Sequence, residues 1–328
     1  MIHGDLRRDA LERWIAAELR GAPFSLTPAS EDASFRRYFR ATLADGGSFV
    51  AMDAPPDKED CRPFIHVAAL LREAGVHAPS VQAQDLERGF LLLSDLGRTT
   101  YLERLTPENA DALFAEATDA LIRWQLATRP GALPPYDEAL LRRELQLFPD
   151  WYVARHLGRA LSPAQAQALE QVCARLVASA LAQPRVFVHR DYMPRNLMVS
   201  TPNPGVLDFQ DAVLGPVSYD MVSLLRDAFV SWEEERVLDW TVRYWQKARA
   251  AGLPVEGDFG EFWRAFEWMG LQRHLKVLGI FARIQYRDGK PKYLADTPRF
   301  VRYAREVARR YGALAPLARL LDELQCAP

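Results

Sequence analysis

Apolar and polar residues follow two different periods in the first hundred positions. Between Leu6 and Leu19 the apolar residues recur every three or four positions, which predicts an amphipathic helix that ends before Gly21. Alternation with a period of two follows, interrupted by a second helical stretch over Arg62–Ala74. The predicted strands are Phe24–Pro28, Arg36–Leu43, Ser48–Ala54, Val81–Asp85 and Gly89–Ser94. These elements predict a small antiparallel sheet accompanied by helices.

Helical spacing dominates the rest of the chain, with one exception. The predicted helices are Asn109–Ala127, one that begins at Ser162, Tyr219–Ser231, Glu233–Ala251, Phe259–Tyr286, Pro298–Tyr311 and a last one reaching Gln325. The exception is a predicted hairpin of strands Leu197–Ser200 and Val206–Phe209, joined by a turn rich in proline and glycine. The pattern therefore predicts an α+β fold with a small sheet-containing part and a larger, mostly helical part.

The stretch around this hairpin carries the candidate chemistry. His189-x-Asp191 is followed by Asn196, and the returning strand places Asp208 between apolar residues. Phosphoryl transfer needs a carboxylate to accept the proton of the attacking hydroxyl and oxygen ligands for Mg²⁺. Asp191 can be that base, and a hairpin of this length returns Asp208 to Asn196 so that both reach one metal site. Unrelated polar residues in a loop are the alternative, but the preceding apolar strand at 186–188 favours the functional interpretation.

Composition limits the class of protein and its partners. The chain has 328 residues, 49% of them hydrophobic, and a formal net charge of −2. Such a charge gives no reason to expect nucleic acid or an anionic membrane as a partner. Three widely spaced cysteines offer neither zinc spacing nor a disulfide framework, and no apolar run is long enough for a membrane helix. The first twenty residues are too charged for a secretory signal. We therefore expect a cytoplasmic monomer.

At this point the chain resembles the protein-kinase-like phosphotransferases of the aminoglycoside phosphotransferase type. The resemblance rests on residues 186–211 and on the continuation through Gly215-Pro216 to Tyr219-Asp220. It implies Asp191 as catalytic base, Asn196 and Asp208 as magnesium ligands, and structural roles for His189 and Asp220. An ordinary helix N-cap is the alternative for Asp220. The implied division is an N-lobe at 1–94 on the nucleotide side, a hinge at 95–98 and a C-lobe at 99–328 with the catalytic loop and the metal and acceptor sites.

The chain departs from the kinase pattern where cations normally meet the phosphates. Asp53 occupies the position of the third-strand lysine, Met193 replaces a catalytic-loop lysine, and the glycine-rich loop is absent. One hypothesis is that Asp53 pairs with an arginine such as Arg62 and so reverses the usual polarity. A nucleotide-binding pseudokinase is the alternative that these losses favour. The residues expected at the ATP site are Ser34, Arg36, Arg37, Ala51, Leu93, Asp95 and Arg195; for the arginines, solvated surface charge is the alternative.

Charge in the C-terminal part bears on the acceptor. Residues 264–310 contain twelve cations and four acids. Such a segment would repel a polycationic antibiotic or choline and would attract an anionic acceptor. A solvated basic face is the alternative explanation.

The whole-chain pattern resembles more specifically the bacterial N-acetylmuramate/N-acetylglucosamine anomeric kinases. The resemblance rests on residues 32–40, 50–56 and 189–197 and spans nearly the full length. It implies ATP- and Mg²⁺-dependent phosphorylation of the anomeric hydroxyl in cell-wall sugar recycling. Another small-molecule kinase of the same fold, of the aminoglycoside, choline or homoserine type, is the alternative. Candidate acceptor-binding residues, chosen by location, are Tyr219, Arg226, Asp227, Trp268 and Arg273.

Overall fold

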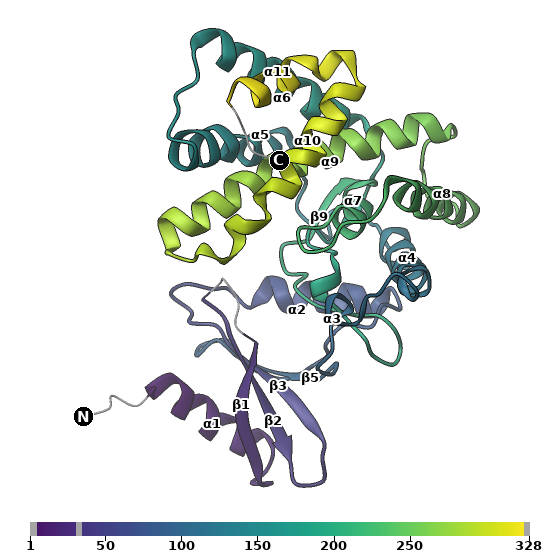
Figure 1. Ribbon diagram of the computed structural model, residues 1–328. Helices are drawn as coiled ribbons and strands as arrows, with labels where there is room; N and C mark the ends of the chain where they lie inside the picture. The colour runs from purple at the N-terminus through teal and green to yellow at the C-terminus, as the bar shows by residue number, and fades with distance from the viewer. Residues whose placement is uncertain (1–4, 31–34, 325–328) are drawn as a thin grey trace. The chain divides into compact units, whose positions relative to one another are not determined.

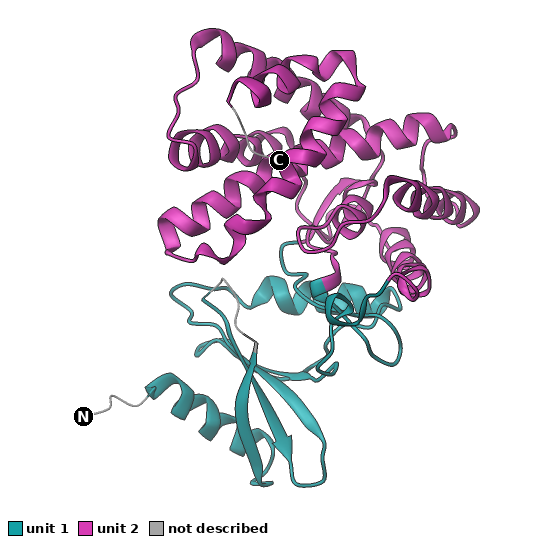
Figure 2. Cartoon of the chain, in the orientation of Figure 1, with its two compact units in different colours: residues 1–106, 195–211 teal, residues 107–194, 212–328 magenta. Residues whose placement is uncertain are grey.

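The computed structural model describes residues 5–30 and 35–324. The chain divides into two units (Figure 2). The first unit comprises residues 1–106 and 195–211, and the second comprises residues 107–194 and 212–328. The hairpin segment that carries Asn196 and Asp208 thus belongs to the first unit, whereas Asp191 belongs to the second. The predicted lobe boundaries at 94 and 99 stay a prediction.

An antiparallel sheet of five strands forms the first unit, in the order β1-β2-β3-β5-β4. Its strands are β1 (Phe24–Ser30), β2 (Arg37–Leu43), β3 (Ser48–Asp53), β4 (Val81–Asp85) and β5 (Phe90–Ser94). The turn between β2 and β3 contains Gly46 at a φ of 88°, and the Asp45 carboxylate accepts the Gly47 N–H at 2.9 Å. Both features are typical of a tight hairpin.

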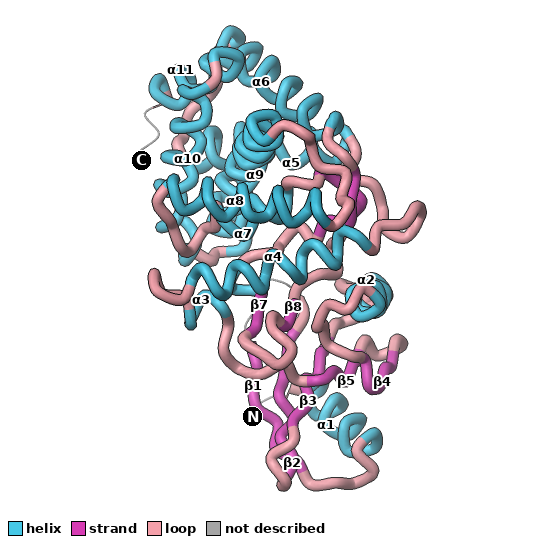
Figure 3. The backbone as a smooth tube through the Cα atoms, turned by 90° about the vertical axis from the view of Figure 1, so that its right-hand side faces the viewer, coloured by secondary structure: helices cyan, strands magenta, loops and turns pink. Residues whose placement is uncertain are grey.

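Helix α1 (Leu6–Glu18) covers one face of this sheet (Figure 1). Its buried residues Leu11, Trp14 and Ile15 pack against alternate residues of the strands, among them Phe39 and Ala51. Because side chains of a strand alternate between its faces, the residues between these must point to the opposite face. Helix α2 (Arg62–Glu73) lies on that other side of the sheet, as Figures 1 and 3 show.

The hairpin of the first unit is held against its neighbours by backbone hydrogen bonds. Strands β7 (Leu197–Met198) and β8 (Gly205–Val206) pair with each other. The Val199 N–H donates to the Thr99 carbonyl at 2.9 Å, and the Val206 N–H donates to the His77 carbonyl at 2.7 Å. Asn203 in the turn donates to the hydroxyl of Tyr101, the first residue of the short helix α3 (Tyr101–Arg104). The hairpin is therefore part of the same folded unit as the sheet.

The second unit is mostly helical. Its elements are α4 (Ala110–Leu126), α5 (Glu138–Leu145), the π-helical η1 (Phe148–His156), α6 (Pro163–Ala182), β6 (Arg185–Val188), β9 (Val213–Pro216), α7 (Tyr219–Leu225), α8 (Glu234–Ala250), α9 (Phe259–Asp288), η3 (Pro291–Asp296), α10 (Thr297–Arg310), η4 (Gly312–Leu314) and α11 (Ala315–Glu323). Strands β6 and β9 form an antiparallel pair. Helix α6 begins with a capping box of Ser162 and Gln165, as the sequence predicts.

Helix α9 is the central element of this unit. Sixteen of its thirty residues are buried, and it packs against η1, α6, α7 and α10. Gly279 is required where α9 meets the segment before η1, because a Cβ there would lie 2.4 Å from the backbone of Leu147. A helix buried on several sides explains why its sequence is apolar over more than one face.

The structure confirms the predicted α+β class, with an antiparallel sheet and a mostly helical remainder. Some local predictions were wrong, and some elements were missed. The hairpin strands predicted over Leu197–Ser200 and Val206–Phe209 end at Met198 and Val206. The helix predicted to reach Ser231 ends at Leu225, where the Asp227 carboxylate accepts the N–H of Ala228 at 2.6 Å and favours a turn over further helix. Strand β9 was not predicted, because four residues with two of them Gly and Pro carry too little pattern. No helix among the described residues combines the length and apolar character that a membrane crossing requires.

Candidate active site

A cavity of about 260 Å³ lies within the first unit. Its walls come from the sheet, from α2, from the segment that follows β5 and from the hairpin. Its lining includes Tyr38, Arg40, Val50, Leu93, Asp95, Leu96, Arg195, Asn196 and Asp208. The cavity thus joins the predicted hinge to both predicted metal ligands, and a concave site lined by a few polar groups is typical of ligand binding.

Strand register decides which predicted ATP-site residues reach this cavity. Arg40 of β2 lies opposite Val50 of β3, and both line the cavity together with Leu93 of β5. Ala51 lies one residue further along and packs on the α1 face instead. Leu93, Asp95 and Arg195 therefore line the cavity, and Arg36, Arg37 and Ala51 do not. Ser34 lies outside the described residues.

The segment that follows β5 is held by a network around Asp95. Arg40 donates to both carboxylate oxygens of Asp95, at 2.5 and 3.1 Å, and to the carbonyl of Gly97 at 2.7 Å. Asp95 also accepts the Ser48 hydroxyl at 2.8 Å and the Gly97 N–H at 3.0 Å. Burial opposes ionisation of Asp95, but these donors outweigh it, so the pKa of the carboxyl lies below its ordinary value.

The two predicted metal ligands meet at the base of the hairpin. Nδ2 of Asn196 lies 3.2 Å from Oδ2 of Asp208, and the Leu207 N–H donates to the Asn196 carbonyl at 2.9 Å. Asp208 has a φ of 62°, a conformation that non-glycine residues rarely adopt and that often marks functional sites. The next residue, Phe209, packs on Phe64 of α2, with ring centroids 4.7 Å apart.

The donor set at this point fits a magnesium ion that also binds phosphates. Gln210 donates to Oδ1 of Asp208 at 2.9 Å, and its own Oε1 is buried with no hydrogen-bond partner among the described residues. Those residues contain no group of three His, Cys, Asp or Glu side chains that could enclose a metal. Mg²⁺ ordinarily takes one or two protein oxygens and completes its octahedron with water and phosphate oxygens, which this smaller set allows. Gln210 was not predicted as a site residue.

In the second unit, the loop after β6 carries Asp191. The Asp191 N–H donates to Nδ1 of His189 at 3.2 Å, and Arg190 between them has a φ of 77°. Asp220 of α7 accepts the N–H of His189 at 2.7 Å and that of Arg190 at 3.0 Å. Burial raises the pKa of Asp220 to about 7, against the effect of these two donors. Its carboxylate thus holds the loop rather than its own helix terminus.

A second buried acid, Glu144 of α5, lies beneath the same loop. It pairs with the guanidinium of Arg190 and with Nζ of Lys276 at 3.0 Å. Tyr136 and Gln272 also donate to it. Burial opposes its ionisation, but Lys276, Arg190 and Tyr136 outweigh burial and lower the pKa of Glu144 to about 2. We call these five residues the Glu144 cluster. The sequence did not reveal it, because Glu144 belongs to no motif.

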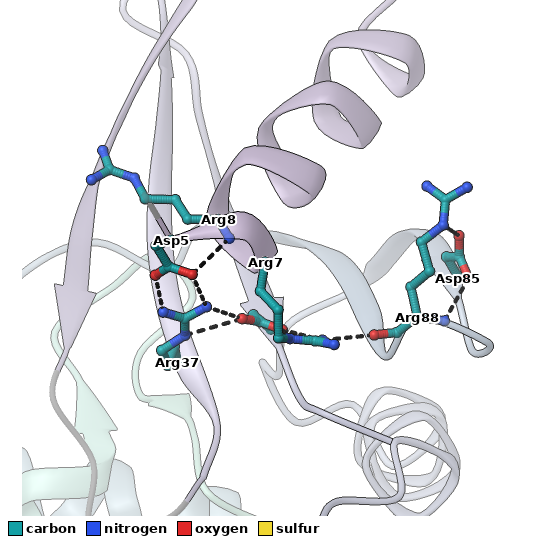
Figure 4. A network of polar contacts seen from close by, with 7 residues as sticks. Asp5, Arg7, Arg8, Arg37, Asp85 and Arg88 are labelled. Atoms are coloured by element: carbon teal, nitrogen blue, oxygen red, sulfur yellow. Dashed lines mark hydrogen bonds and ion pairs between the residues drawn. The ribbon is translucent and has the colours of Figure 1, made fainter. Parts of the chain in front are cut away.

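The departure at Asp53 has a structural explanation. Asp53 is fully buried and accepts hydrogen bonds from Arg7 of α1, at 2.9 and 2.5 Å, and from Arg37 of β2, at 3.0 and 2.5 Å. Arg37 also pairs with Asp5, and Figure 4 shows this pair together with Arg7, whose guanidinium reaches the carbonyl of Arg88. We call Asp5, Arg7, Arg37 and Asp53 the Asp53 cluster.

The hypothesis of an arginine partner for Asp53 is confirmed, but Arg62 was the wrong choice. Arg62 pairs with its neighbour Asp60 at 2.9 Å. Asp53 follows Ala51 on the α1 face of the sheet, so its partners come from α1 and β2. The comparison of Asp53 with a phosphate-binding lysine did not predict that its side chain lies on the α1 face of the sheet.

The candidate acceptor residues have unequal surroundings. Tyr219 accepts a hydrogen bond from Lys276 at 3.0 Å, Arg226 lies over the ring of Tyr303, and Trp268 packs edge-on against Tyr311. Nε1 of Trp268 is buried with no hydrogen-bond partner among the described residues, and the same holds for one polar atom each of Asp227 and Arg273. The side chains of Asp227 and Arg273 are buried, and the two atoms are Oδ2 of Asp227 and Nη1 of Arg273. Burial raises the pKa of Asp227 to about 6, which the charge of Arg273 partly offsets.

The basic segment 264–310 is largely neutralised by acids. Seven of its twelve cations form ion pairs. These cations are Arg264, Lys276, Arg287, Arg299, Arg305, Arg309 and Arg310. Its net charge is therefore a weak argument for an anionic acceptor, and the argument has to rest on individual residues instead.

A family model described as the phosphotransferase enzyme family matches residues 25–255, which include the cavity, the hairpin and the loop of Asp191. The chain belongs to this family. The phosphotransferase is 62% identical over 302 residues to a Pseudomonas aeruginosa protein named N-acetylmuramate/N-acetylglucosamine kinase, with 92% of this chain and 89% of that protein covered. A Neisseria meningitidis protein of the same name is 53% identical over 322 residues, covering 97% and 96%.

Solved structures with low sequence identity share the fold of the phosphotransferase. A choline/ethanolamine kinase family protein from Mesorhizobium loti matches with a TM-score of 0.64 and 17% identity, covering 95% of this chain and 99% of that one. The gentamicin complex of APH(2")-IIa matches with a TM-score of 0.62 and 14% identity, covering 92% and 97%. The predicted protein-kinase-like fold and the predicted family are thus confirmed.

Proposed function

We propose that the phosphotransferase transfers the γ-phosphoryl group of ATP to the anomeric hydroxyl of N-acetylmuramate, N-acetylglucosamine or both, in the recycling of cell-wall sugars. The observation that carries the proposal is the 62% identity, over 92% of the chain, to a protein named for these two amino sugars. The cavity with a hinge at one part of its lining and two oxygen ligands at another supports a nucleotide as the phosphoryl donor.

Asn196 and Asp208 would hold the magnesium ion, with the orphaned Oε1 of Gln210 beside them. A bound Mg²⁺ would neutralise phosphate charge and orient the phosphates of ATP. Arg195 also lines the cavity, next in sequence to Asn196, and is the cation that we assign to the phosphates. Arg195 would thus supply, from the segment before the hairpin, the positive charge that a lysine of the third strand supplies in other kinases.

Asp191 would orient the sugar hydroxyl and accept its proton. Three hydrogen bonds restrict the backbone that carries this carboxylate. The Asp191 N–H donates to His189, and two N–H groups of the loop donate to Asp220. An anomeric hydroxyl is more acidic than an ordinary alcohol, so orientation of the attacking oxygen contributes more than basicity.

Asp227 and Arg273 are the strongest candidates for acceptor recognition. Their orphaned polar atoms are buried, and such atoms usually find a partner in the functional state. A guanidinium suits the carboxylate of N-acetylmuramate, and a carboxylate suits sugar hydroxyl groups.

The test is ³¹P NMR of the product formed from ATP and N-acetylmuramate. A phosphate on the anomeric carbon is expected, and a phosphate on another carbon would refute the proposal. A panel that includes N-acetylglucosamine, choline, homoserine and an aminoglycoside, assayed by ADP release, distinguishes the other kinases of this fold. Magnesium-dependent ATP binding without ADP release on any acceptor would instead favour a pseudokinase.

The first variant to make is Asp191→Asn. Loss of the base is expected to lower kcat by about 10³-fold, within the range for general base catalysis, while ATP affinity stays within about twofold. The measurements are steady-state turnover and calorimetric titration with Mg·ATP. Glu138→Gln is the control, since Glu138 is an exposed acid of the same unit that pairs with Arg142. Retained turnover in Asp191→Asn contradicts the assignment.

A further inference from the structure

We infer that Arg40 is a positioning residue for the purine of the nucleotide. It holds the Asp95–Gly97 segment in an arrangement in which the backbone N–H and carbonyl of Leu96 can form hydrogen bonds with the base. The inference rests on the proposed use of ATP. Arg40 was not among the residues predicted at the ATP site.

Arg40 connects a strand of the sheet to the segment after β5. It lies on the cavity face of β2, opposite Val50, and its side chain is nearly buried. Its guanidinium binds the Asp95 carboxylate through two nitrogens and reaches the Gly97 carbonyl at 2.7 Å. A planar guanidinium with several fixed donors can hold a carboxylate and a carbonyl together, which a lysine cannot do in the same geometry.

In this network the backbone N–H and carbonyl of Gly97 are hydrogen-bonded, whereas those of Leu96 are not hydrogen-bonded to any described residue. The Gly97 N–H donates to Asp95, and the Gly97 carbonyl accepts from Arg40. Leu96 lines the cavity, and its backbone N–H and carbonyl are the donor and acceptor that we assign to a ligand there.

A fixed donor and acceptor discriminate between purines. Adenine presents a ring nitrogen acceptor beside an amino donor, whereas guanine presents a carbonyl acceptor beside a ring N–H donor. A backbone that presents its two groups in one order therefore fits one base and leaves unpaired groups with the other. If Arg40 is removed, the Gly97 carbonyl loses its partner and the segment gains freedom to present other groups.

Arg40 is engaged too fully to act as a phosphate cation. Its charge is met by Asp95, which the Ser48 hydroxyl also holds. Its effect on the nucleotide is therefore expected through the segment that it fixes. Such an indirect role predicts a change in nucleotide affinity and base preference with little change in kcat.

The Asp53 cluster provides a matched control on the other face of the sheet. Arg7 binds the Asp53 carboxylate through two nitrogens and donates to the carbonyl of Arg88 at 2.7 Å. It thus repeats the geometry of Arg40, one carboxylate and one carbonyl, away from the cavity lining. Arg7→Met removes an equivalent set of bonds and tests whether lost stability alone alters nucleotide binding.

The experiment is calorimetric titration of the full chain with Mg·ATP and Mg·GTP, together with kcat and KM for both nucleotides. Arg40→Met is expected to weaken ATP binding by about 10- to 100-fold and to lower the preference for ATP over GTP by about tenfold. Arg40→Lys keeps the charge but not the two-nitrogen geometry, and we expect about half the effect on a logarithmic scale. For Arg7→Met, the ATP affinity and the preference for ATP over GTP are both expected to stay within about twofold of those of the unaltered protein.

Ser48→Ala guards against a variant that fails to fold. It removes one hydrogen bond to Asp95 and keeps Arg40, so a change of about threefold in the same direction is expected. If Arg40→Met and Ser48→Ala fold and bind both nucleotides as the unaltered protein does, the inference is wrong while the proposed function stands. If the unaltered protein binds neither nucleotide, the proposed function is wrong and the inference falls with it.

Discussion

Each unit of the phosphotransferase buries one acid between two cations, and the two acids differ in what they hold. In the first unit, Asp53 lies between Arg7 and Arg37. In the second unit, Glu144 lies between Arg190 and Lys276. Both carboxylates are nearly inaccessible, with side chains 0% and 6% exposed. A buried carboxylate with two cationic partners is thus a shared solution to the cost of burying charge.

The difference lies in the partners. Asp53 connects α1 to the sheet on the face away from the cavity lining, and its cations are 36% and 38% exposed. Glu144 connects α9 to Arg190, the residue directly before Asp191, and its cations are 18% and 9% exposed. The same chemistry therefore attaches a helix in one unit and holds the loop of the proposed base in the other. We therefore expect a change at Glu144 to affect both turnover and stability, and a change at Asp53 to affect stability alone.

Glu144→Gln is the sharpest test of this comparison and has the largest expected effect. It leaves Arg190 and Lys276 buried without their acid, which is expected to cost about 3–5 kcal/mol of unfolding free energy. Displacement of the loop before Asp191 by a fraction of an ångström is expected to lower kcat by about 100-fold. Urea unfolding and steady-state turnover measure the two effects. A variant that loses stability but keeps its turnover would end the distinction between the two clusters.

The pH dependence of stability offers a second test of the Glu144 cluster. Because the pKa of Glu144 is about 2 in the folded protein and ordinarily 4.5, its contribution to stability is complete above pH 4.5 and is lost as the pH falls toward 2. The loss over that range is expected to be about 3 kcal/mol. We expect the difference in unfolding free energy between the unaltered protein and Glu144→Gln to shrink between pH 5 and pH 3. A constant difference would contradict the ion-pair account.

Asp53→Asn has the smallest expected effect. Its cations can be hydrated once the charge is removed, because more than a third of each side chain is exposed. A loss of about 2 kcal/mol of unfolding free energy is therefore expected, below the cost at Glu144, with turnover and nucleotide affinity within about twofold. Denaturation together with calorimetric titration measures both. A large fall in nucleotide affinity would instead show that Asp53 acts at the nucleotide site.

Local patterns explain what could be predicted without a structure. The alternation within β2 and β3, the cap of α6 and the hairpin that returns Asp208 to Asn196 each depend on residues close in sequence. Short windows encode such features, because hydrogen-bonding periods and turn residues act over a few positions. The fold class and the proposed metal-ligand pair followed from these patterns, together with the resemblance of residues 186–211 to a known family.

The sequence by itself determined the five strands of the sheet, which face of these strands is apolar and where Asp191, Asn196 and Asp208 lie along the chain. Only the tertiary structure decided how buried charges pair. Arg190 and Glu144 are 46 positions apart, and Arg40 and Asp95 are 55 apart. Several arginines were equally available in the sequence to Asp53, and the packing of α1 on the sheet selected Arg7 over Arg62. The physical reason is that an ion pair requires proximity in space, which no periodic pattern encodes for distant residues.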